Sequence, residues 1–485
     1  MSNGYSPTGG LDGRPFLSLA ALVLVAACSS APAIAPATVP APAIDEAALL
    51  DELQHRTFLW FWETANSKNG LVPDRWPTKS PSSIASVGFG LTAYAVGVER
   101  GWITREQARE RVLTTLEFFA NAPQGPDARG MTGHRGFFFH FLDMETGERF
   151  RETELSSIDT TLFLAGALFC QSYFDGDDPA EVRIRNLAEQ LYTSADWKYY
   201  LVRPPLLNMG WRPERGFGPG IWRGLNEGAI LYILALASPA HAVDRASWDA
   251  WASTYQWKSY HGQEHINFAP LFGHQYSHVW IDFRGIQDDY LRRKGIDFFE
   301  NSRRATLAQR AYAIANPEAF RDYGENVWGL TASDGPGGGT LTIDGRERKF
   351  FGYRARGASA TELVDDGTIA PTAAIGSIAF APEIVIPAIV EMKSRYGDAL
   401  YQKYGFIDAF NPTLREQAPF VNKGTVDPSK GWFDSDYIGI DQGPILLMIE
   451  NYRTGLIWNV MKKNPHIVRG LQRAGFRGGW LETVK

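Results

Sequence analysis

The sequence predicts an all-α protein folded as an (α/α)6 toroid, in which six inner helices are surrounded by six outer helices and joined by rim loops. Three observations lead to this prediction: strongly apolar helical segments recur at a nearly constant interval, amphipathic helical segments lie between them, and few stretches alternate like a β-strand. A helix that is apolar on all sides belongs inside a protein, and an amphipathic helix belongs outside. The alternation therefore predicts two concentric helical layers.

The apolar segments begin about 70 residues apart, an interval long enough for one inner and one outer helix with their loops. The fourth segment is more charged than the others. We expect the six inner helices to begin near Gly88, Asp159, Glu227, Glu300, Thr372 and Asp441.

The segments between them have one apolar and one charged face, as expected for outer helices. In the first of them, Thr104 and Gln107 have the spacing of a capping box, which marks a helix N-terminus. The best strand pattern, residues 339–351, is predicted to form a small β-hairpin in a rim loop. The clearest outer helices are Thr104 to Ala120, Glu181 to Ala195 and Glu383 to Tyr396.

Composition excludes two classes of protein. Of 485 residues, 44% are hydrophobic and 21% charged, which excludes wholesale disorder. The net charge is −6, so no general positive field attracts polyanions, and nucleic acid is not an expected partner. Residues 44–485 contain no second low-complexity stretch longer than a loop, and we expect them to form one catalytic domain.

The N-terminal residues resemble an export signal. Residues 1–27 contain an apolar run too short to span a bilayer permanently, and small residues precede Cys28 as in a bacterial lipoprotein signal peptide. This pattern predicts cleavage before Cys28 and lipidation of its sulfur, with 28–43 as an Ala/Pro-rich linker. The expected location is the outer membrane, facing the periplasm; a plain signal peptide is the alternative. The other cysteine, Cys170, is predicted to be a buried small hydrophobe.

Three acidic residues stand at the starts of predicted inner helices. Parallel inner helices share one rim of the central cavity, so Asp159, Glu227 and Asp441 should meet there. Each could simply favour a helix N-terminus electrostatically, and Asp159 follows Ser156 at capping-box spacing. Taken together, three acids on one rim favour a glycosidase, which needs two carboxylates facing each other across the cleaved bond.

The loops between the helices are rich in groups that bind sugars. Flat aromatic rings cover the apolar faces of pyranoses, while His, Arg and carboxylate groups bind the hydroxyls. Aromatic residues are also common in protein cores, so each single Trp has a packing explanation of equal weight. The candidate substrate-binding residues are His134, Trp222, His274, Tyr276, His278, Trp280, Asp282, Glu325 and Trp328, with Trp76, Trp211 and Arg284 in the same loops.

A zinc peptidase is a competing interpretation. His261-Gly262-Gln263-Glu264-His265 matches the H-x-x-E-H pattern, in which one helix face presents two histidines to the metal. Gly262 weakens such a helix, and Pro270 follows closely. No metal and no organic cofactor is expected.

Several longer motifs, in order between about Leu49 and Trp458, resemble the bacterial glucoamylase-like domain family. That family includes endo-β-1,2-glucanases, enzymes that release sophorose, and domains of cyclic β-1,2-glucan synthases. The motifs are Asn226-Glu227-Gly228-Ala229, the stretch from Gly329 to Pro336, the stretch from Asp366 to Ala374, and Asp441-Gln442-Gly443-Pro444.

The resemblance implies an (α/α)6 fold and an anomer-inverting hydrolase that acts on β-1,2-glucan, an oligo- or polysaccharide. It implies Glu227 as general acid and Asp441 as general base, with Asp434 and Asp436 as alternatives for the base. Glu154 and Asp159 match a further family stretch and are candidates for binding substrate or supporting the catalytic pair.

Two loops are longer than the family pattern: Thr340 to Arg356 and Gln417 to Lys430. Loops shape the cleft, so endo and exo action both stay open. Two other functions also stay open: a lipoprotein that binds surface glycans without cutting them, and a polysaccharide lyase that uses Tyr276 or His278 as base.

Overall fold

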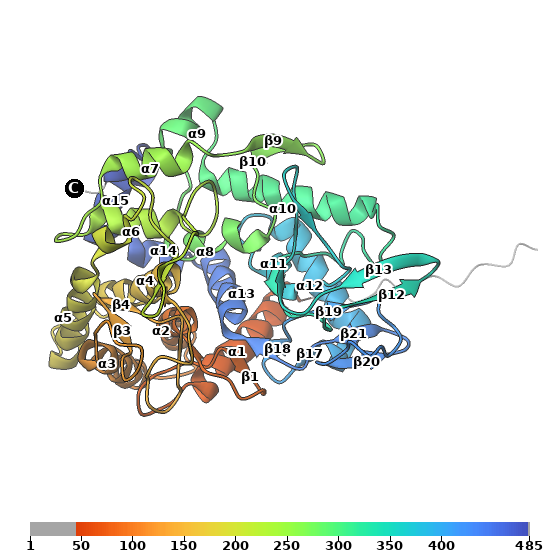
Figure 1. Ribbon diagram of the computed structural model, residues 1–485, viewed down its shortest axis with the longest axis horizontal. Coiled ribbons are helices and arrows are strands. Elements are labelled where there is room, and N and C mark those ends of the chain that lie inside the picture. Colours follow the sequence, from red (N-terminus) through yellow and green to blue (C-terminus); the bar gives the residue numbers. More distant parts are fainter. Residues whose placement is uncertain (1–44, 484–485) are drawn as a thin grey trace, which may run out of the picture. The chain divides into compact units, whose positions relative to one another are not determined.

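The computed structural model describes residues 45–483, and the predicted signal peptide, lipidated Cys28 and most of the linker lie outside this range. Six helices consist mostly of buried residues, and Figure 1 labels each of them. In the three shortest of them every residue is buried, as expected for segments that are apolar on all sides. The six are α2 (Ile84–Glu99), α4 (Ser157–Tyr173), α6 (Ala229–Ala237), α8 (Tyr276–Trp280), α11 (Pro371–Ile375) and α13 (Gly439–Arg453).

Small residues allow three of these helices to approach closely. A Cβ atom at Gly88 of α2 would lie 2.2 Å from the carbonyl oxygen of Leu162 in α4, and one at Gly443 of α13 would lie 2.3 Å from Cγ of Phe89 in α2. No side chain larger than hydrogen fits at either crossing. Helices α4, α2 and α13 are therefore consecutive neighbours.

Side-chain hydrogen bonds connect the remaining buried helices. Ser277 of α8 donates to the carbonyl of Glu227, just before α6, at 3.1 Å. Gln275, directly before α8, donates to the carbonyl of Ala373 in α11 at 2.8 Å, and Thr372 of α11 donates to the carbonyl of Asp441 in α13 at 2.8 Å. With the contact between α4 and α6, the six helices succeed one another from α2 to α13 and back to α2.

A second set of helices covers this centre with one apolar face each. The predicted capping box of Thr104 and Gln107 is confirmed at the start of α3, where both reciprocal hydrogen bonds form. This set comprises α1 (Glu46–Thr64), α3 (Arg105–Asn121), α5 (Pro179–Ser194), α10 (Phe298–Ala315), α12 (Pro382–Tyr396) and α15 (Pro465–Ala474). Shorter helices are α7 (Arg245–Ala252), α9 (Asp289–Lys294) and α14 (Leu456–Met461).

The fourth predicted inner segment needs a correction. The helix near Glu300, α10, belongs to the covering set, because Arg303 pairs with Glu383 and Arg304 with Glu300 on its solvent side. Helix α8 takes the inner place instead. It is only five residues long, too short for periodicity to identify it.

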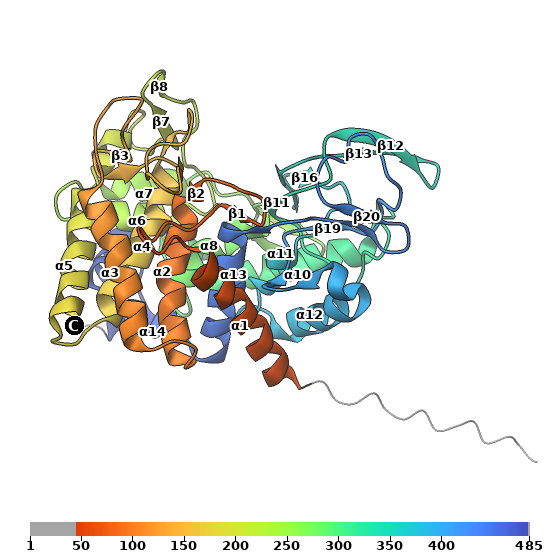
Figure 2. The same cartoon turned by 90° about the horizontal axis from the view of Figure 1, so that it is seen from below.

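The loops also contain more β-structure than the single hairpin that the sequence predicts. That hairpin is confirmed as β12 (Gly339–Ile343) and β13 (Arg346–Phe350). Most other strands are two to four residues long and show no readable alternation. They gather at one end of the long helices (Figure 2). They include β1 (Arg75–Trp76), β5 (Phe141–Leu142), β7 (Gly210–Arg212), β11 (Ala332–Ser333), β14 (Arg354–Ala355), β19 (Phe410–Asn411), β20 (Thr425–Asp427), β21 (Gly431–Phe433) and β22 (Tyr437–Ile438).

A second, smaller hydrophobic core lies beneath the β12–β13 hairpin and the β19–β21–β20 sheet. Phe350 of the hairpin stacks on Phe420 with ring centroids 5.5 Å apart. The two loops predicted to be longer than usual, 340–356 and 417–430, therefore pack on each other. Within residues 45–483, no helix combines the length and apolar character needed to cross a bilayer.

Candidate active site

A cavity of about 660 Å³ opens at the end of the helices where the short strands gather. Predicted residues Asp159, Glu227 and Tyr276 all line it, so the expectation that acids meet at one rim holds for two of the three. The other polar lining residues are Asp74, Arg75, Ser83, His140, Arg151, Thr153 and Tyr353.

Glu227 stands in the turn just before α6. Burial raises the pKa of its carboxyl to about 7, and the charge of Asp159 adds to the rise, although a peptide N–H hydrogen bond opposes it. A carboxyl group with such a pKa keeps its proton in about half of the molecules at neutral pH and can donate it.

Asp159 lies in the first turn of α4 and has the capping role considered above. Its backbone N–H donates to Oγ of the N-cap residue Ser156 at 3.1 Å, and Ser156 Oγ donates to the Asp159 carboxylate. The same carboxylate lines the cavity beside Glu227. Asp159 therefore both takes part in capping α4 and lines the cavity.

His140, which motif analysis missed, connects two predicted acids. Its Nδ1 lies 3.0 Å from Oε1 of Glu154 and its Nε2 lies 3.7 Å from Oδ1 of Asp159. Burial opposes the charged imidazolium, but these carboxylates overcome it and raise the pKa of His140 to about 9. Burial likewise opposes ionisation of Glu154, yet His140 and Arg212 lower its pKa to about 2. Glu154 thus holds His140 in the cavity wall without lining the cavity itself.

Asp441 lies in the first turn of α13 and is 2% exposed. It does not line the cavity, but its charge acts on the hydroxyls of the lining residues Tyr276 and Tyr353. Burial and the charges of Asp334 and Asp74 raise the pKa of Asp441. The pKa of Asp408 is also raised, by burial and by the charges of Asp441 and Asp334.

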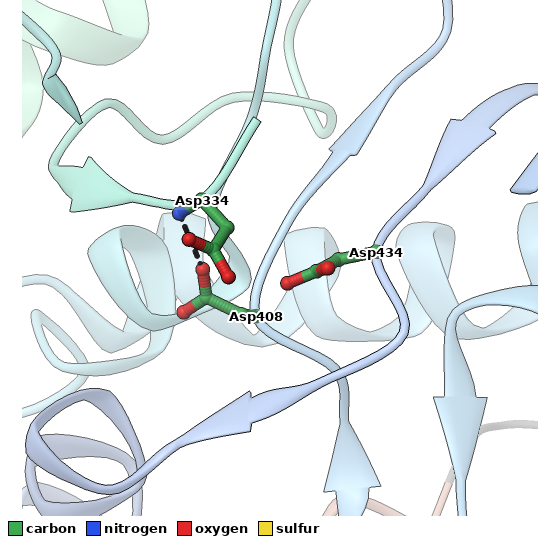
Figure 3. Close-up of side chains that lie close together, drawn as sticks. All are labelled: Asp334, Asp408 and Asp434. Carbon is green, nitrogen blue, oxygen red and sulfur yellow. Dashed lines mark hydrogen bonds between the residues drawn. The ribbon is translucent and has the colours of Figure 1, made fainter. Parts of the chain in front are cut away.

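Asp408 belongs to a cluster of buried carboxylates beside Asp441. Asp334, Asp408 and Asp434 point toward one another, with carboxylate oxygens within 4.8 Å (Figure 3). The backbone N–H of Asp334 donates to Asp408 at 2.7 Å. The three residues come from loops after β11, before β19 and after β21, so only the folded chain brings them together.

Two cations balance this cluster. Arg75 contacts Asp334 at 2.6 Å and Asp74 at 3.1 Å. Lys423, on the 417–430 loop, bonds to Asp334 and lies 2.8 Å from Asp436 Oδ2. The oxygens of Asp334, Asp408 and Asp434 are close enough to hold a cation, but the Lys423 ammonium lies 3.5 Å from Asp434 and supplies that charge from within the chain.

Asp436 differs from its neighbours in this cluster. Burial disfavours its ionised form, but hydrogen bonding by Lys423 and by the Thr78 backbone N–H, at 2.9 Å, produces a net lowering of its pKa. The pKa of Asp434 is instead raised, by burial and by Asp334 and Asp408. Among the three candidates for the general base, the pKa of Asp436 is therefore lowered, whereas the pKa values of Asp434 and Asp441 are raised.

The tryptophans predicted to bind substrate lie in the core. Trp280 and Trp328 are 0% exposed, and the Trp280 indole donates to Thr92 at 3.0 Å. The Trp222 indole donates to Ser157 at 2.9 Å. None of the three lines the cavity, so the structure does not support their prediction as sugar-binding rings. Their large rings suit the apolar centre of the protein, in agreement with the alternative that they serve packing.

Two of the three histidines predicted for substrate binding, His274 and His278, are also buried away from the cavity. His274 donates through Nε2 to the carbonyl of Phe268 at 3.1 Å, and His278 Nε2 lies 3.1 Å from Ser302 Oγ. Burial lowers the pKa of each imidazole to about 3, so both are neutral. A role for His278 as the base of a lyase has no support in this placement.

Three other predicted residues lie outside the cavity, two in ion pairs and one against an aromatic ring. Asp282 accepts from Arg284 at 2.7 Å and pairs with Lys462, and Glu325 pairs with Arg310 at the surface. His134 is half-buried against Trp211, with ring centroids 5.2 Å apart. Each has a structural role in this position, and none lines the cavity.

The histidine pair of the zinc-peptidase interpretation is not on a helix. Residues 261 and 262 form the turn between β9 (Trp257–Tyr260) and β10 (Gln263–Ile266), with φ of 44° and 80°. A hairpin does not present both histidines on one helical face, so this interpretation is corrected.

Motif analysis missed most of the polar residues around the cavity. Asp74, Arg75 and His140 lie in short loops without a recognisable motif, and Tyr353 lies in a loop noted only for its length. Asp334 had a signal, because it belongs to one of the motifs that carry the family resemblance. Long-range contacts bring the others into the site.

Comparison with known proteins places this geometry in a family. Residues 220–465, about half of the chain, match the family described as "Glycoamylase: Putative glucoamylase". A solved structure described as a putative glucoamylase from Bacteroides uniformis is 33% identical and has a TM-score of 0.76, covering 90% of this chain and 99% of that chain. An endo-β-1,2-glucanase from Chitinophaga pinensis, solved with sophorotriose and glucose, is 27% identical with a TM-score of 0.75, covering 90% of this chain and 100% of that one.

A curated relative from Parabacteroides distasonis is named exo β-1,2-glucooligosaccharide sophorohydrolase (non-reducing end). It is 27% identical over 466 residues, which cover 89% of this chain and 58% of that enzyme's length. The family match and the similarity to the Bacteroides uniformis structure over nearly its whole length confirm the resemblance seen in the motifs. The chain belongs to the glucoamylase-like family.

Proposed function

We propose that the chain is a glycoside hydrolase that cleaves β-1,2-glucan by single displacement with inversion. The observation that carries the proposal is Glu227, a carboxyl group in the cavity wall whose pKa burial raises to about 7. The Chitinophaga and Parabacteroides relatives, which are named as enzymes of β-1,2-linked glucans, support the choice of substrate.

Glu227 donates its proton to the glycosidic oxygen, and Asp441 removes a proton from the attacking water. Burial raises the pKa of both Asp408 and Asp441, but the hydrogen bond between the two carboxyl groups raises the pKa of Asp408 and lowers that of Asp441. We therefore assign the proton that the pair shares to Asp408, which leaves Asp441 as the proton acceptor. Because Asp441 does not line the cavity, it acts through an intervening water or substrate hydroxyl.

The fold in this proposal is the (α/α)6 toroid. Its support is the succession of the six buried helices from α2 back to α2 and the amphipathic helices that cover them. In such a toroid the N-termini of the inner helices face one cavity, as those of α4 and α6 do here.

The experiment offers the purified protein linear β-1,2-glucan beside β-1,3-, β-1,4- and α-1,4-glucans, and follows the products by chromatography and by NMR of their anomeric protons. We expect short β-1,2-gluco-oligosaccharides from the first substrate alone, released as the α-anomer. Glu227→Gln should abolish cleavage and preserve binding, while Glu325→Gln, a surface carboxylate outside the cavity, should behave like the wild type. No cleavage of β-1,2-glucan contradicts the proposal.

We further propose that the chain is exported and anchored through a lipid on Cys28, facing the periplasm from the outer membrane. The support is the short apolar run and the small residues before Cys28. In cells fed a labelled fatty acid, the wild-type protein should carry the label in the membrane fraction and Cys28→Ser should not. A wild-type protein without label contradicts anchoring.

A further inference from the structure

Tyr353 lies at the cavity with its ring open to solvent. Of the few large hydrophobic side chains that are exposed among the described residues, it is the one that lines the cavity, and it is 56% exposed. It stands between β13 and β14, on the 340–356 loop. The predicted sugar-binding tryptophans lie in the core, so Tyr353 offers the site an exposed aromatic face.

Arg356 holds the backbone of the loop that contains Tyr353. This guanidinium is fully buried and forms two hydrogen bonds with Asp366, at 2.7 and 2.8 Å. It also donates to the carbonyls of Phe351 at 3.3 Å and Gly352 at 3.2 Å, directly before Tyr353. A loop fixed by a buried bidentate ion pair presents its side chain with little conformational entropy left to lose on binding.

Arg356 also links this loop to the carboxylate cluster. Its Nη1 donates to the carbonyls of Ser333 at 2.9 Å and Asp334 at 3.2 Å. The same guanidinium therefore sets the position of Tyr353 and the position of the Asp334 backbone. Arg356 therefore fixes the position of the Tyr353 loop relative to the carboxylate cluster.

The hydroxyl of Tyr353 is near enough to Asp441 and Asp408 for their charges to act on it. Desolvation and these charges keep the pKa of the hydroxyl well above its usual range, so it stays protonated. No hydrogen bond to another described residue affects this hydroxyl, so its O–H is available to donate to a ligand. Tyr276, also near Asp441, lines the same cavity but is only 4% exposed.

We propose that Tyr353 is a substrate-binding residue whose ring covers a glucosyl unit at the cavity mouth and whose hydroxyl donates a hydrogen bond to that sugar beside Asp441. The inference rests on the proposed function, because it names the group that positions the substrate of that same site. A pyranose ring has apolar C–H faces that suit an aromatic ring, and hydroxyls that suit a phenol donor.

The test measures kcat and KM on linear β-1,2-glucan for the wild type, Tyr353→Ala, Tyr353→Phe and Tyr353→Trp. Loss of the ring should raise KM about tenfold, whereas Phe and Trp, which keep an aromatic face, should stay within about threefold. Tyr452→Ala is the matched control: Tyr452 is 39% exposed near the end of α13, outside the cavity lining, and its loss should leave both constants unchanged.

A second measurement separates binding from folding. In the Glu227→Gln background, titration calorimetry with a β-1,2-gluco-oligosaccharide should show about tenfold weaker binding when Tyr353→Ala is added, at an unchanged melting temperature. Wild-type cleavage with Tyr353→Ala at wild-type KM and affinity overturns the inference and leaves the proposed function standing. A wild-type protein that neither cleaves nor binds β-1,2-glucan contradicts the proposed function first, and the inference with it.

Discussion

The Nδ1 atom of His140 lies 3.0 Å from Oε1 of Glu154, and this contact decides the charge of the cavity wall beside Asp159. Burial alone would keep His140 neutral, but the two carboxylates raise its pKa to about 9. A cation is therefore held beside Asp159, whose own charge helps to keep Glu227 protonated. Glu154 affects the site through His140.

Glu154→Gln should lower the pKa of His140, because it removes the carboxylate that hydrogen-bonds to the imidazolium. NMR titration of the histidine ring protons measures this directly. Arg212 and the peptide backbone also hold Glu154, so Arg212→Gln serves as the comparison and should shift His140 much less. An unchanged His140 pKa in Glu154→Gln contradicts the assignment.

The same pair predicts how stability depends on pH. The raised pKa of His140 contributes stability that is complete below about 6.5 and is lost as pH rises toward about 9. The lowered pKa of Glu154 contributes stability that is complete above about 4.5 and is lost as pH falls toward about 2. Urea unfolding of the wild type should thus show the largest contribution of the pair between about pH 4.5 and 6.5, and Glu154→Gln should flatten that maximum.

Asp159→Asn should move the alkaline limb of the activity profile to lower pH. Burial is the main cause of the raised pKa of Glu227, and the negative charge of Asp159 adds to it. Removing that charge lowers the pKa of Glu227, so the general acid loses its proton at lower pH. The measurement is kcat/KM on β-1,2-glucan between pH 5 and 9. A limb that stays in place or moves upward shows that Asp159 does not act on the proton donor.

Asparagine substitutions distinguish the three candidates for the general base. Asp441→Asn should reduce kcat by about 10²–10⁴ with little change in substrate affinity, as for the loss of a general base. Asp434→Asn should reduce it far less, because the charge of Asp441, rather than that of Asp434, acts on the cavity residues Tyr276 and Tyr353. If Asp436→Asn produces the largest loss instead, the base is the carboxylate held ionised by Lys423.

Lys423→Met should destabilise the protein, most of all near neutral pH. Removing one partner of a buried ion pair costs about 3–5 kcal/mol in the free energy of unfolding, because the remaining charges stay buried. Without the ammonium, the pKa of Asp436 should rise, so the difference in stability from the wild type should shrink as acidification protonates Asp436. Lys423→Arg, which keeps the charge, should recover most of both effects. Equal stability of Lys423→Met and the wild type contradicts a role for this counter-ion.

His261→Ala and treatment with EDTA should both leave cleavage of β-1,2-glucan unchanged. His261 lies in the turn of a β-hairpin with φ of 44°, where the H-x-x-E-H pattern cannot present its histidines as a helix would. Full loss of activity in His261→Ala, or full loss after EDTA that added zinc reverses, would support the zinc-peptidase interpretation.

Local patterns in the sequence were sufficient to predict most of the helices and two acidic residues of the site, Glu227 and Asp159. The capping box of Thr104 and Gln107, the hairpin at 339–351 and the apolar segments of α2, α4, α6 and α13 are properties of neighbouring residues, and the structure contains each of them. Glu227 and Asp159 could be placed at one rim because the ends of parallel inner helices must lie together.

Only the tertiary structure decided which aromatic rings meet the cavity and which carboxylates surround Asp441. The sequence does not distinguish a tryptophan in the core from one in a sugar-binding site, because burial depends on what packs against the ring. Asp334, Asp408 and Asp434 come from separate loops, and Lys423 from another, so their charges interact only after chain segments far apart in sequence have packed around the small second core. Proton affinities in this site arise from burial and from those long-range charges, and neither can be read from neighbouring residues.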